Sequence, residues 1–181
     1  MINLIQSNFT FVITSITLLS NIVFVVLLFL ILFDKRFKKL AYSIVNRHIL
    51  SFLFVVSFGA LVASLTYSEV MNFLPCELCW ISRIFMYPQA ILTFMAMRRK
   101  DKNIVEYLLP LSILGAIVSF YHSLVHWGLG VGVLPCTAVG AECYKVYVLE
   151  YGYITIPFMA FTSFVYLIFI SILYFKSKNA Q

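Results

Sequence analysis

The chain alternates between long apolar stretches and short polar segments that carry most of its charged residues. A helix needs about 20 mostly apolar residues to cross the hydrocarbon core of a bilayer. Five stretches approach or exceed that length, and we expect each to form a membrane-spanning helix. They are residues 9–33, 49–68, 79–97, 108–121 and 153–175. The fourth has the shortest uncharged core, and its helix could start as early as Ile104. The pattern therefore predicts an all-α membrane protein.

The composition supports this interpretation and excludes several classes of protein. Hydrophobic residues make up 62% of the chain and charged residues 11%, whereas ordinary globular proteins have roughly 45–50% and 25%. A domain of this size still exposes about 30% of the surface of its unfolded chain, and 13 basic and 7 acidic side chains are too few to cover it. Much of the surface must therefore face lipid. This excludes a soluble enzyme, a nucleic-acid-binding domain and a disordered chain.

The basic residues are confined to alternate polar segments. All but two of the 13 lie in the first connection, the third connection and the C-terminal tail. They are Lys35, Arg36, Lys38, Lys39, Arg47, Arg98, Arg99, Lys100, Lys102, Lys176 and Lys178. Cytoplasmic segments carry such an excess of Lys and Arg, so we expect a cytoplasmic C-terminus and outer connections at 69–78 and 122–152. The net charge of +6 is a signal of topology rather than of an acidic partner.

The first stretch, residues 9–33, is interpreted as a retained helix because no small-residue cleavage site follows it. It is more polar than the others, with hydroxyl residues such as Thr14, Thr17 and Ser20. Small hydroxyl residues favour close packing between helices in lipid. We expect that role for them, with a functional polar lining as the alternative.

All four cysteines lie on the expected outer side of the membrane, where disulfides persist. Cys76 and Cys79 are separated by two residues at the predicted start of the third helix. Unpaired backbone amides and the helix dipole stabilise a thiolate there, so a disulfide between them would exchange readily. Cys136 and Cys143 enclose six residues, a loop that can close into a disulfide and open again.

Both pairs begin with the same Leu-Pro-Cys sequence, ending at Cys76 and Cys136, which indicates two related sites that exchange with each other. The alternatives are two inert disulfides that staple the outer loops, or a four-thiolate zinc site. A Cys-x-x-Cys ring is too short to add much stability, and the wider spacing of the second pair fits zinc poorly. We therefore predict redox chemistry and no metal site.

Arg83 follows Cys79 by four residues and so lies on the same face of the helix, one turn deeper in the membrane. A charge there costs about 2.5–3.5 kcal/mol on insertion scales, which points to a function. A guanidinium can hydrogen-bond the carbonyl oxygen of a lipid-soluble oxidant such as a quinone; the alternative is a side chain that extends to the headgroups. His122 and His126, one turn apart, could relay protons or simply pack at the interface.

The stretch PCELCWISRIFMYP at residues 75–88, followed by a second outer cysteine pair and GYITIP at 152–157, resembles the DsbB/BdbC family of membrane disulfide oxidoreductases over about residues 44–175. The resemblance implies a DsbB-like four-helix transmembrane bundle in the bacterial cell membrane. Such a bundle takes electrons from an extracytoplasmic thioredoxin-fold thiol oxidase (DsbA/BdbD-like) and passes them to ubiquinone or menaquinone.

Carried over to this sequence, the resemblance assigns Cys136 and Cys143 to the partner, Cys76 and Cys79 to the quinone, and Arg83 to quinone contact. Residues 1–43 would be an additional transmembrane helix and a cytoplasmic loop, and 44–181 the bundle with its two cysteine loops. The additional helix and the compact second cysteine loop depart from the family pattern.

The leading hypothesis is a quinone-dependent thiol-disulfide oxidoreductase that drives disulfide formation in exported proteins. A conduit for reducing equivalents would need cysteines within the spans or on the cytoplasmic side, and the sequence has neither. A vitamin K epoxide reductase-like enzyme would carry its loop pair before the Cys-x-x-Cys, and the order here is the reverse. A structural membrane subunit with stapled outer loops gives Arg83 no purpose.

Overall fold

The computed structural model describes residues 2–129, 143 and 145–179, and it is all-helical apart from turns and one isolated bridge between Glu150 and Ile154 within these residues. A short π-helix, η1, continues the second helix. In chain order the helices are α1 (Ile2–Phe33), α2 (Lys35–Leu65), η1 (Thr66–Val70), α3 (Glu77–Arg99), α4 (Ile104–His126) and α5 (Ile156–Asn179). The all-α prediction is confirmed, with one helix for each predicted stretch.

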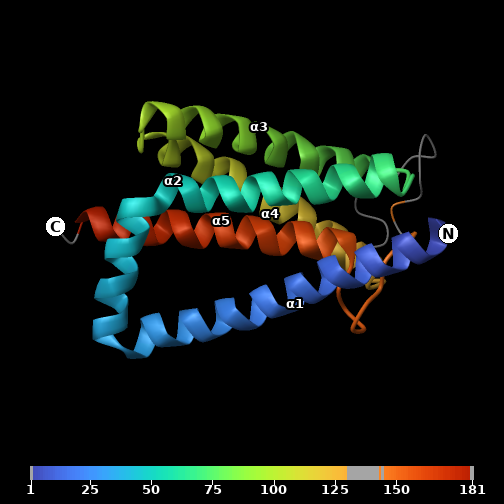
Figure 1. The fold of residues 1–181 in the computed structure, drawn as a ribbon, viewed down its shortest axis with the longest axis horizontal. Helices are drawn as coiled ribbons and strands as arrows, with labels where there is room; N and C mark the ends of the chain where they lie inside the picture. Colours follow the sequence, from blue (N-terminus) through green and yellow to red (C-terminus); the bar gives the residue numbers. More distant parts are fainter. Residues whose placement is uncertain (1, 130–142, 144, 180–181) are drawn as a thin grey trace.

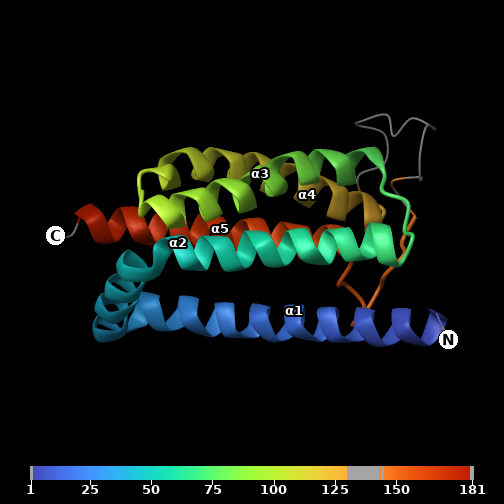
Figure 2. The same ribbon diagram turned by 45° about the horizontal axis from the view of Figure 1, so that its top comes forward.

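Four of the helices form a bundle and α1 lies alongside it (Figures 1 and 2). α2, α3, α4 and α5 each pack against two neighbours, and α5 closes the ring against α2. The core contains large apolar side chains from α2, α4 and α5 that are almost wholly buried, among them Leu53, Leu108 and Phe164. The predicted four-helix bundle with one additional helix is therefore what the structure shows.

Four of the five helices are long and apolar enough to cross a membrane on length and composition alone within the described residues. These spans are Asn8–Phe33, Lys35–Val70, Ile104–His126 and Ile156–Asn179. α3 has sufficient length, 23 residues, but is more polar. Its polar side chains face the bundle: Gln89 accepts a hydrogen bond from Ser112 at 2.9 Å, and Thr93 lies 3.4 Å from Ser57. α3 runs beside the other helices (Figure 2), so its polarity reflects helix packing.

The connection expected to be a loop after residue 33 is helical. Asp34 caps α2 by accepting a hydrogen bond from the backbone N–H of Arg36 at 2.8 Å, which is a favourable start for a helix. The helix bends at His48, where the backbone leaves helical geometry (φ −117°, ψ 18°). Residues before the bend cross the end of the bundle and residues after it run along the bundle (Figure 1).

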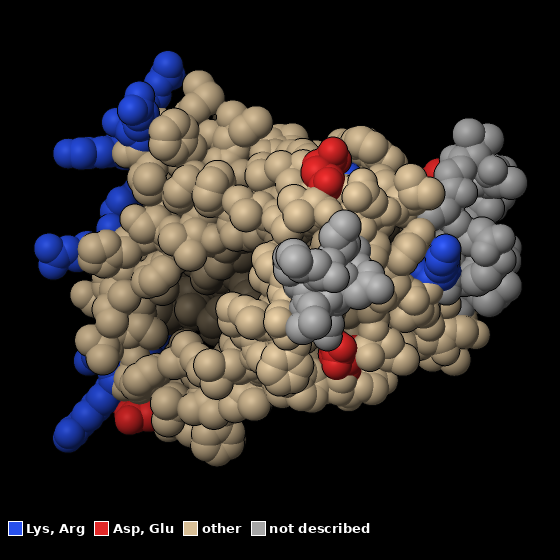
Figure 3. Space-filling model, turned by 45° about the vertical axis from the view of Figure 1, so that its right-hand side comes forward, with Lys and Arg blue, Asp and Glu red and all other residues tan. Residues whose placement is uncertain are grey.

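Charge and cysteines are separated along the molecule. Lys and Arg side chains gather at the end where α1 meets α2 (Figure 3). Cys76, which precedes α3, and Cys143, which lies between α4 and α5, are at the opposite end. This separation is the arrangement that the orientation argument requires; the side of the membrane on which each end lies stays a prediction.

Replacing Gly115 with Ala should destabilise the bundle. A Cβ at this position in α4 would collide with the ring of Phe164, which is fully buried on α5. Overpacking of this kind costs about 1–3 kcal/mol, so thermal unfolding in detergent should show a lower midpoint. Gly59→Ala is the matched control, because a Cβ at Gly59 meets no atom within 4 Å. Equal midpoints for the two variants would contradict this packing.

Candidate redox site

The Cys76–Cys79 pair begins α3. Cys76 occupies the N-cap position and Cys79 the first turn, with Pro75 fixing the backbone just before them. The Cys76 thiol donates a hydrogen bond to the Cys79 sulfur, with the two sulfur atoms 3.2 Å apart. The backbone N–H of Cys76 also donates to the Cys79 sulfur, as an N-cap amide does toward the third residue of a helix. Both bonds would stabilise negative charge on the Cys79 sulfur.

The two sulfurs are therefore chemically different. Donating the hydrogen bond to Cys79, together with burial, raises the pKa of Cys76 to about 12. In the reduced pair Cys76 holds its proton at neutral pH, and the hydrogen bonds that Cys79 accepts would stabilise a thiolate at that sulfur. The sequence-based expectation of a reactive thiolate at the start of the third helix stays a prediction, and the geometry points to Cys79 as the sulfur to test.

Two histidines from α4 adjoin this pair. His122 is buried, and its Nε2 atom lies 3.5 Å from the sulfur of Cys76. His126 lies one turn further along, with the two imidazole ring centroids 4.9 Å apart. The sequence left open whether these side chains belong to a site. The contact with Cys76 places His122 in it.

The ligand atoms of Cys76, Cys79 and His122 lie within 4.8 Å of one another. These donor types suit zinc, which prefers four tetrahedral ligands in structural sites. Within the part of the chain that the structure describes, no fourth histidine, cysteine or carboxylate joins the group. Three ligands beside an apolar cavity can also bind a metal with an open position, and the metal content of the purified protein would show whether they do.

Cys143 lies next to the first pair. It is buried and packs in one cluster with Cys76, Leu78 and Val125. Cys143 follows Cys76 by 67 positions along the chain. The fold thus brings a cysteine of the second outer connection to the start of α3. Cys136 lies outside the described residues, and exchange between the two pairs stays a prediction.

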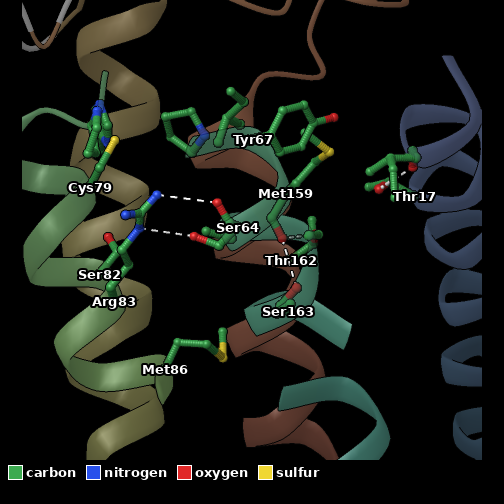
Figure 4. A pocket seen from close by; sticks show the side chains of 18 of the residues that line it. Thr17, Ser64, Tyr67, Cys79, Ser82, Arg83, Met86, Met159, Thr162 and Ser163 are labelled. Atoms are coloured by element: carbon green, nitrogen blue, oxygen red, sulfur yellow. Dashed lines mark hydrogen bonds between the residues drawn. The ribbon is translucent and has the colours of Figure 1, made fainter. Parts of the chain in front are cut away.

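The Arg83 guanidinium is held inside the bundle. Its Nε donates to the Ser64 hydroxyl at 3.1 Å and its Nη2 to the Ser64 carbonyl at 3.3 Å (Figure 4). The side chain is 9% exposed, and its guanidinium carbon lies 5.3 Å from the centre of the Trp80 ring. An arginine that extends to the headgroups would be exposed at its tip. The burial of the side chain thus argues against the interfacial interpretation of Arg83, and its contact with a quinone stays a prediction.

A cavity of about 530 Å³ adjoins these residues. Cys79 and Arg83 face it from α3, Tyr67 from η1 and Met159 from α5, while Thr17 lies across from them on α1 (Figure 4). Most of its wall is apolar. The cavity thus brings the Cys79 sulfur, a guanidinium and an apolar volume together.

Sequence reasoning found Arg83 but missed its partner Ser64, because a serine in an apolar helix looks like an ordinary packing residue. For the hydroxyl residues of the first stretch it offered a functional lining only as the alternative to helix packing, and the structure places Thr17 and Ser20 in the cavity wall. Both roles depend on which faces of the helices meet.

The fold and this site define a multi-pass membrane thiol-disulfide oxidoreductase. Residues 46–174 match the family described as disulfide bond formation protein DsbB, and the chain belongs to that family. The matched region leaves out α1.

Curated relatives agree with this assignment. Disulfide bond formation protein C of Bacillus subtilis is 40% identical over 115 residues, covering 63% of this chain and 83% of that protein. The SPbeta prophage-derived disulfide bond formation protein B of the same organism is 39% identical over 140 residues, 75% of this chain and 94% of that protein. A probable disulfide formation protein of Oceanobacillus iheyensis is 38% identical over 148 residues, 80% and 99%. No solved structure gives a significant match.

The family resemblance inferred from residues 75–88 is thereby confirmed, and the protein has a disulfide oxidoreductase role. Family membership favours this enzyme class over a structural subunit with stapled loops and over a vitamin K epoxide reductase-like protein.

Proposed function

We propose that the protein is a quinone-dependent thiol-disulfide oxidoreductase of the bacterial cell membrane that reoxidises an extracytoplasmic thioredoxin-fold dithiol oxidase. The partner's two thiols become a disulfide as the Cys136–Cys143 disulfide is reduced. The resulting dithiol then reduces the Cys76–Cys79 disulfide. Two electrons and two protons finally pass to ubiquinone or menaquinone, which restores the Cys76–Cys79 disulfide. The reoxidised partner goes on to form disulfides in exported proteins.

The observation that carries the proposal is that Cys79 and Arg83 face one apolar cavity. A quinone needs an apolar site within the membrane and hydrogen-bond donors for its carbonyl oxygens. Two N–H groups of Arg83 contact Ser64, and a guanidinium has five such donors. The residues present therefore fit a quinone, which when bound would supply the two-electron oxidant.

In this proposal each residue of the site has a separate role. Arg83 would orient the acceptor and stabilise negative charge on its oxygen. Cys79, which lines the cavity and accepts the hydrogen bond from Cys76, would be the sulfur nearest the acceptor. His122 lies 3.5 Å from the sulfur of Cys76, so it is placed to accept the Cys76 proton when the disulfide closes again. His126 would continue that proton path.

The decisive experiment is to mix the purified protein with a reduced thioredoxin-fold oxidase and follow quinone absorbance. We expect continuous quinone reduction that requires both the partner and the protein. Exchange with the partner but no reduction of either quinone would contradict the quinone assignment and leave the disulfide oxidoreductase role intact. Stoichiometric zinc in the purified protein, measured by mass spectrometry of the metal, would instead favour a metal site at Cys76, Cys79 and His122.

The orientation can be tested separately. A reporter fused after Gln181 should be cytoplasmic, because the basic segments are expected there. In intact cells an impermeant thiol reagent should label cysteines of the reduced protein. A reporter that is active outside the cell would contradict the orientation and remove the cysteines from the oxidising compartment.

A further inference from the structure

α1 is tied to the rest of the protein by specific polar contacts. The Ser15 hydroxyl lies 2.9 Å from the Tyr151 hydroxyl, and the Ser20 hydroxyl lies 3.1 Å from the Tyr166 hydroxyl. Tyr166 also donates a hydrogen bond to Asn21. Interhelical hydrogen bonds of this kind help to fix one helix against another in lipid. α1 therefore has a defined position beside α5, although it lies outside the region matched by the family.

The cavity at the redox site extends between α1 and α2. Ile16 and Thr17 contribute to its wall from α1, and Gly59, Ala60 and Ala63 contribute from α2. These α2 residues have no side chain beyond Cβ, so they leave space between the two helices. Thr17 lies across the cavity from α3 and α5 (Figure 4). α1 thus forms one wall of the cavity.

The hydroxyl groups on this side of α1 leave the wall effectively apolar. Thr17 donates to the Ile13 carbonyl at 2.9 Å, and Ser20 donates to the Thr17 carbonyl at 2.9 Å. A hydroxyl that is bonded to its own helix needs no partner in the cavity. The remaining surface of these side chains is methyl or methylene, which suits a hydrocarbon ligand.

The cavity also extends along α2, away from Arg83. It is lined along α2 from Ser64, the partner of Arg83, to Val55. Nine residues of helix span roughly 14 Å. The apolar volume therefore runs from the guanidinium toward the middle of the membrane-spanning part of α2.

We propose that α1 and α2 enclose the polyprenyl tail of the quinone, and that α1 thereby selects quinones with long tails. This inference rests on the proposed function, because it assumes that the quinone ring lies beside Cys79 and Arg83. A phospholipid acyl chain has similar apolar chemistry. The prenylated quinone is favoured because the same cavity continues to a guanidinium suited to a ring carbonyl.

The test compares two phenylalanine substitutions on opposite sides of α1. Thr17→Phe places a ring in the cavity. Leu19→Phe is the matched control, because Leu19 is 63% exposed and does not line the cavity. Binding is measured by quenching of Trp80 fluorescence in a Trp127→Phe background. The chain has two tryptophans, so Trp80 is then the only one left. Each protein, in lipid nanodiscs, is titrated with a quinone lacking a tail and with a long-tailed quinone.

We expect Thr17→Phe to weaken binding of the long-tailed quinone on the order of tenfold, equal to about 1.4 kcal/mol. Binding of the tail-less quinone should not change, and Leu19→Phe should change neither. Equal effects on the two quinones, or none, would overturn the tail site while leaving the quinone site in place. Failure of the parent protein to bind either quinone would overturn the proposed function itself. Loss of a co-purifying phospholipid from Thr17→Phe, with unchanged quinone binding, would overturn the tail site in favour of an acyl chain.

Discussion

Replacing Cys79 with Ser should reduce continuous quinone reduction by about 10³-fold or more, because removing a catalytic nucleophile alone costs several powers of ten in rate. A serine hydroxyl can accept the hydrogen bond that the Cys79 sulfur accepts from Cys76, so the start of α3 should keep its shape. The serine cannot form a disulfide with Cys76, so electrons cannot pass from this pair to the quinone. The expected defect is therefore in electron transfer and not in folding.

The measurement compares the oxidation of a single equivalent of partner with continuous turnover. With a reduced thioredoxin-fold partner, Cys79→Ser should still oxidise up to one equivalent through Cys136 and Cys143, and then stop. The unfolding midpoint should stay close to that of the parent protein. A Cys79→Ser protein that reduces quinone continuously would show that another sulfur faces the acceptor, and the order of electron transfer would have to be reassigned.

The helices could be predicted from the sequence because each apolar stretch approaches or exceeds the length that a helix needs to cross a bilayer. The shape of the first connection could not. Its lysines and arginines indicated a cytoplasmic loop, yet Asp34 starts a helix there that continues to Leu65 with a bend at His48. High charge and helical structure are compatible at an interface, so charge alone could not decide between a loop and a helix.

The site could be predicted only where it follows from spacing within one helix. Cys79 and Arg83 share a face because they are four residues apart. Ser64 belongs to the site because α2 packs against α3 in one particular register, and that register depends on side-chain packing along both helices. Thr17 is a similar case: its position opposite the cavity depends on how α1 docks against the bundle.

The Arg83→Gln variant should lower kcat/KM for quinone by about 10- to 100-fold, because a charge-assisted hydrogen bond is worth about 1.5–3 kcal/mol. Glutamine can keep one contact with Ser64 but brings no charge to an acceptor oxygen. The Trp80 ring also loses its cation, which lies 5.3 Å from the ring centre. Exchange between the partner and Cys136 should be unaffected.

Two further variants show whether the loss belongs to this guanidinium. Arg83→Lys should recover only part of the activity, since an ammonium keeps the charge but not the planar set of donors. Arg98→Gln is the matched control, because Arg98 lies in the last turn of α3, far from Cys79, and its guanidinium carbon is 5.3 Å from the Phe94 ring centre. It should leave quinone kinetics unchanged. If Arg83→Gln is as active as Arg98→Gln in a well-folded sample, the Ser64 contacts of Arg83 serve only to join α2 to α3. The acceptor oxygen must then be bound by another donor around Cys79.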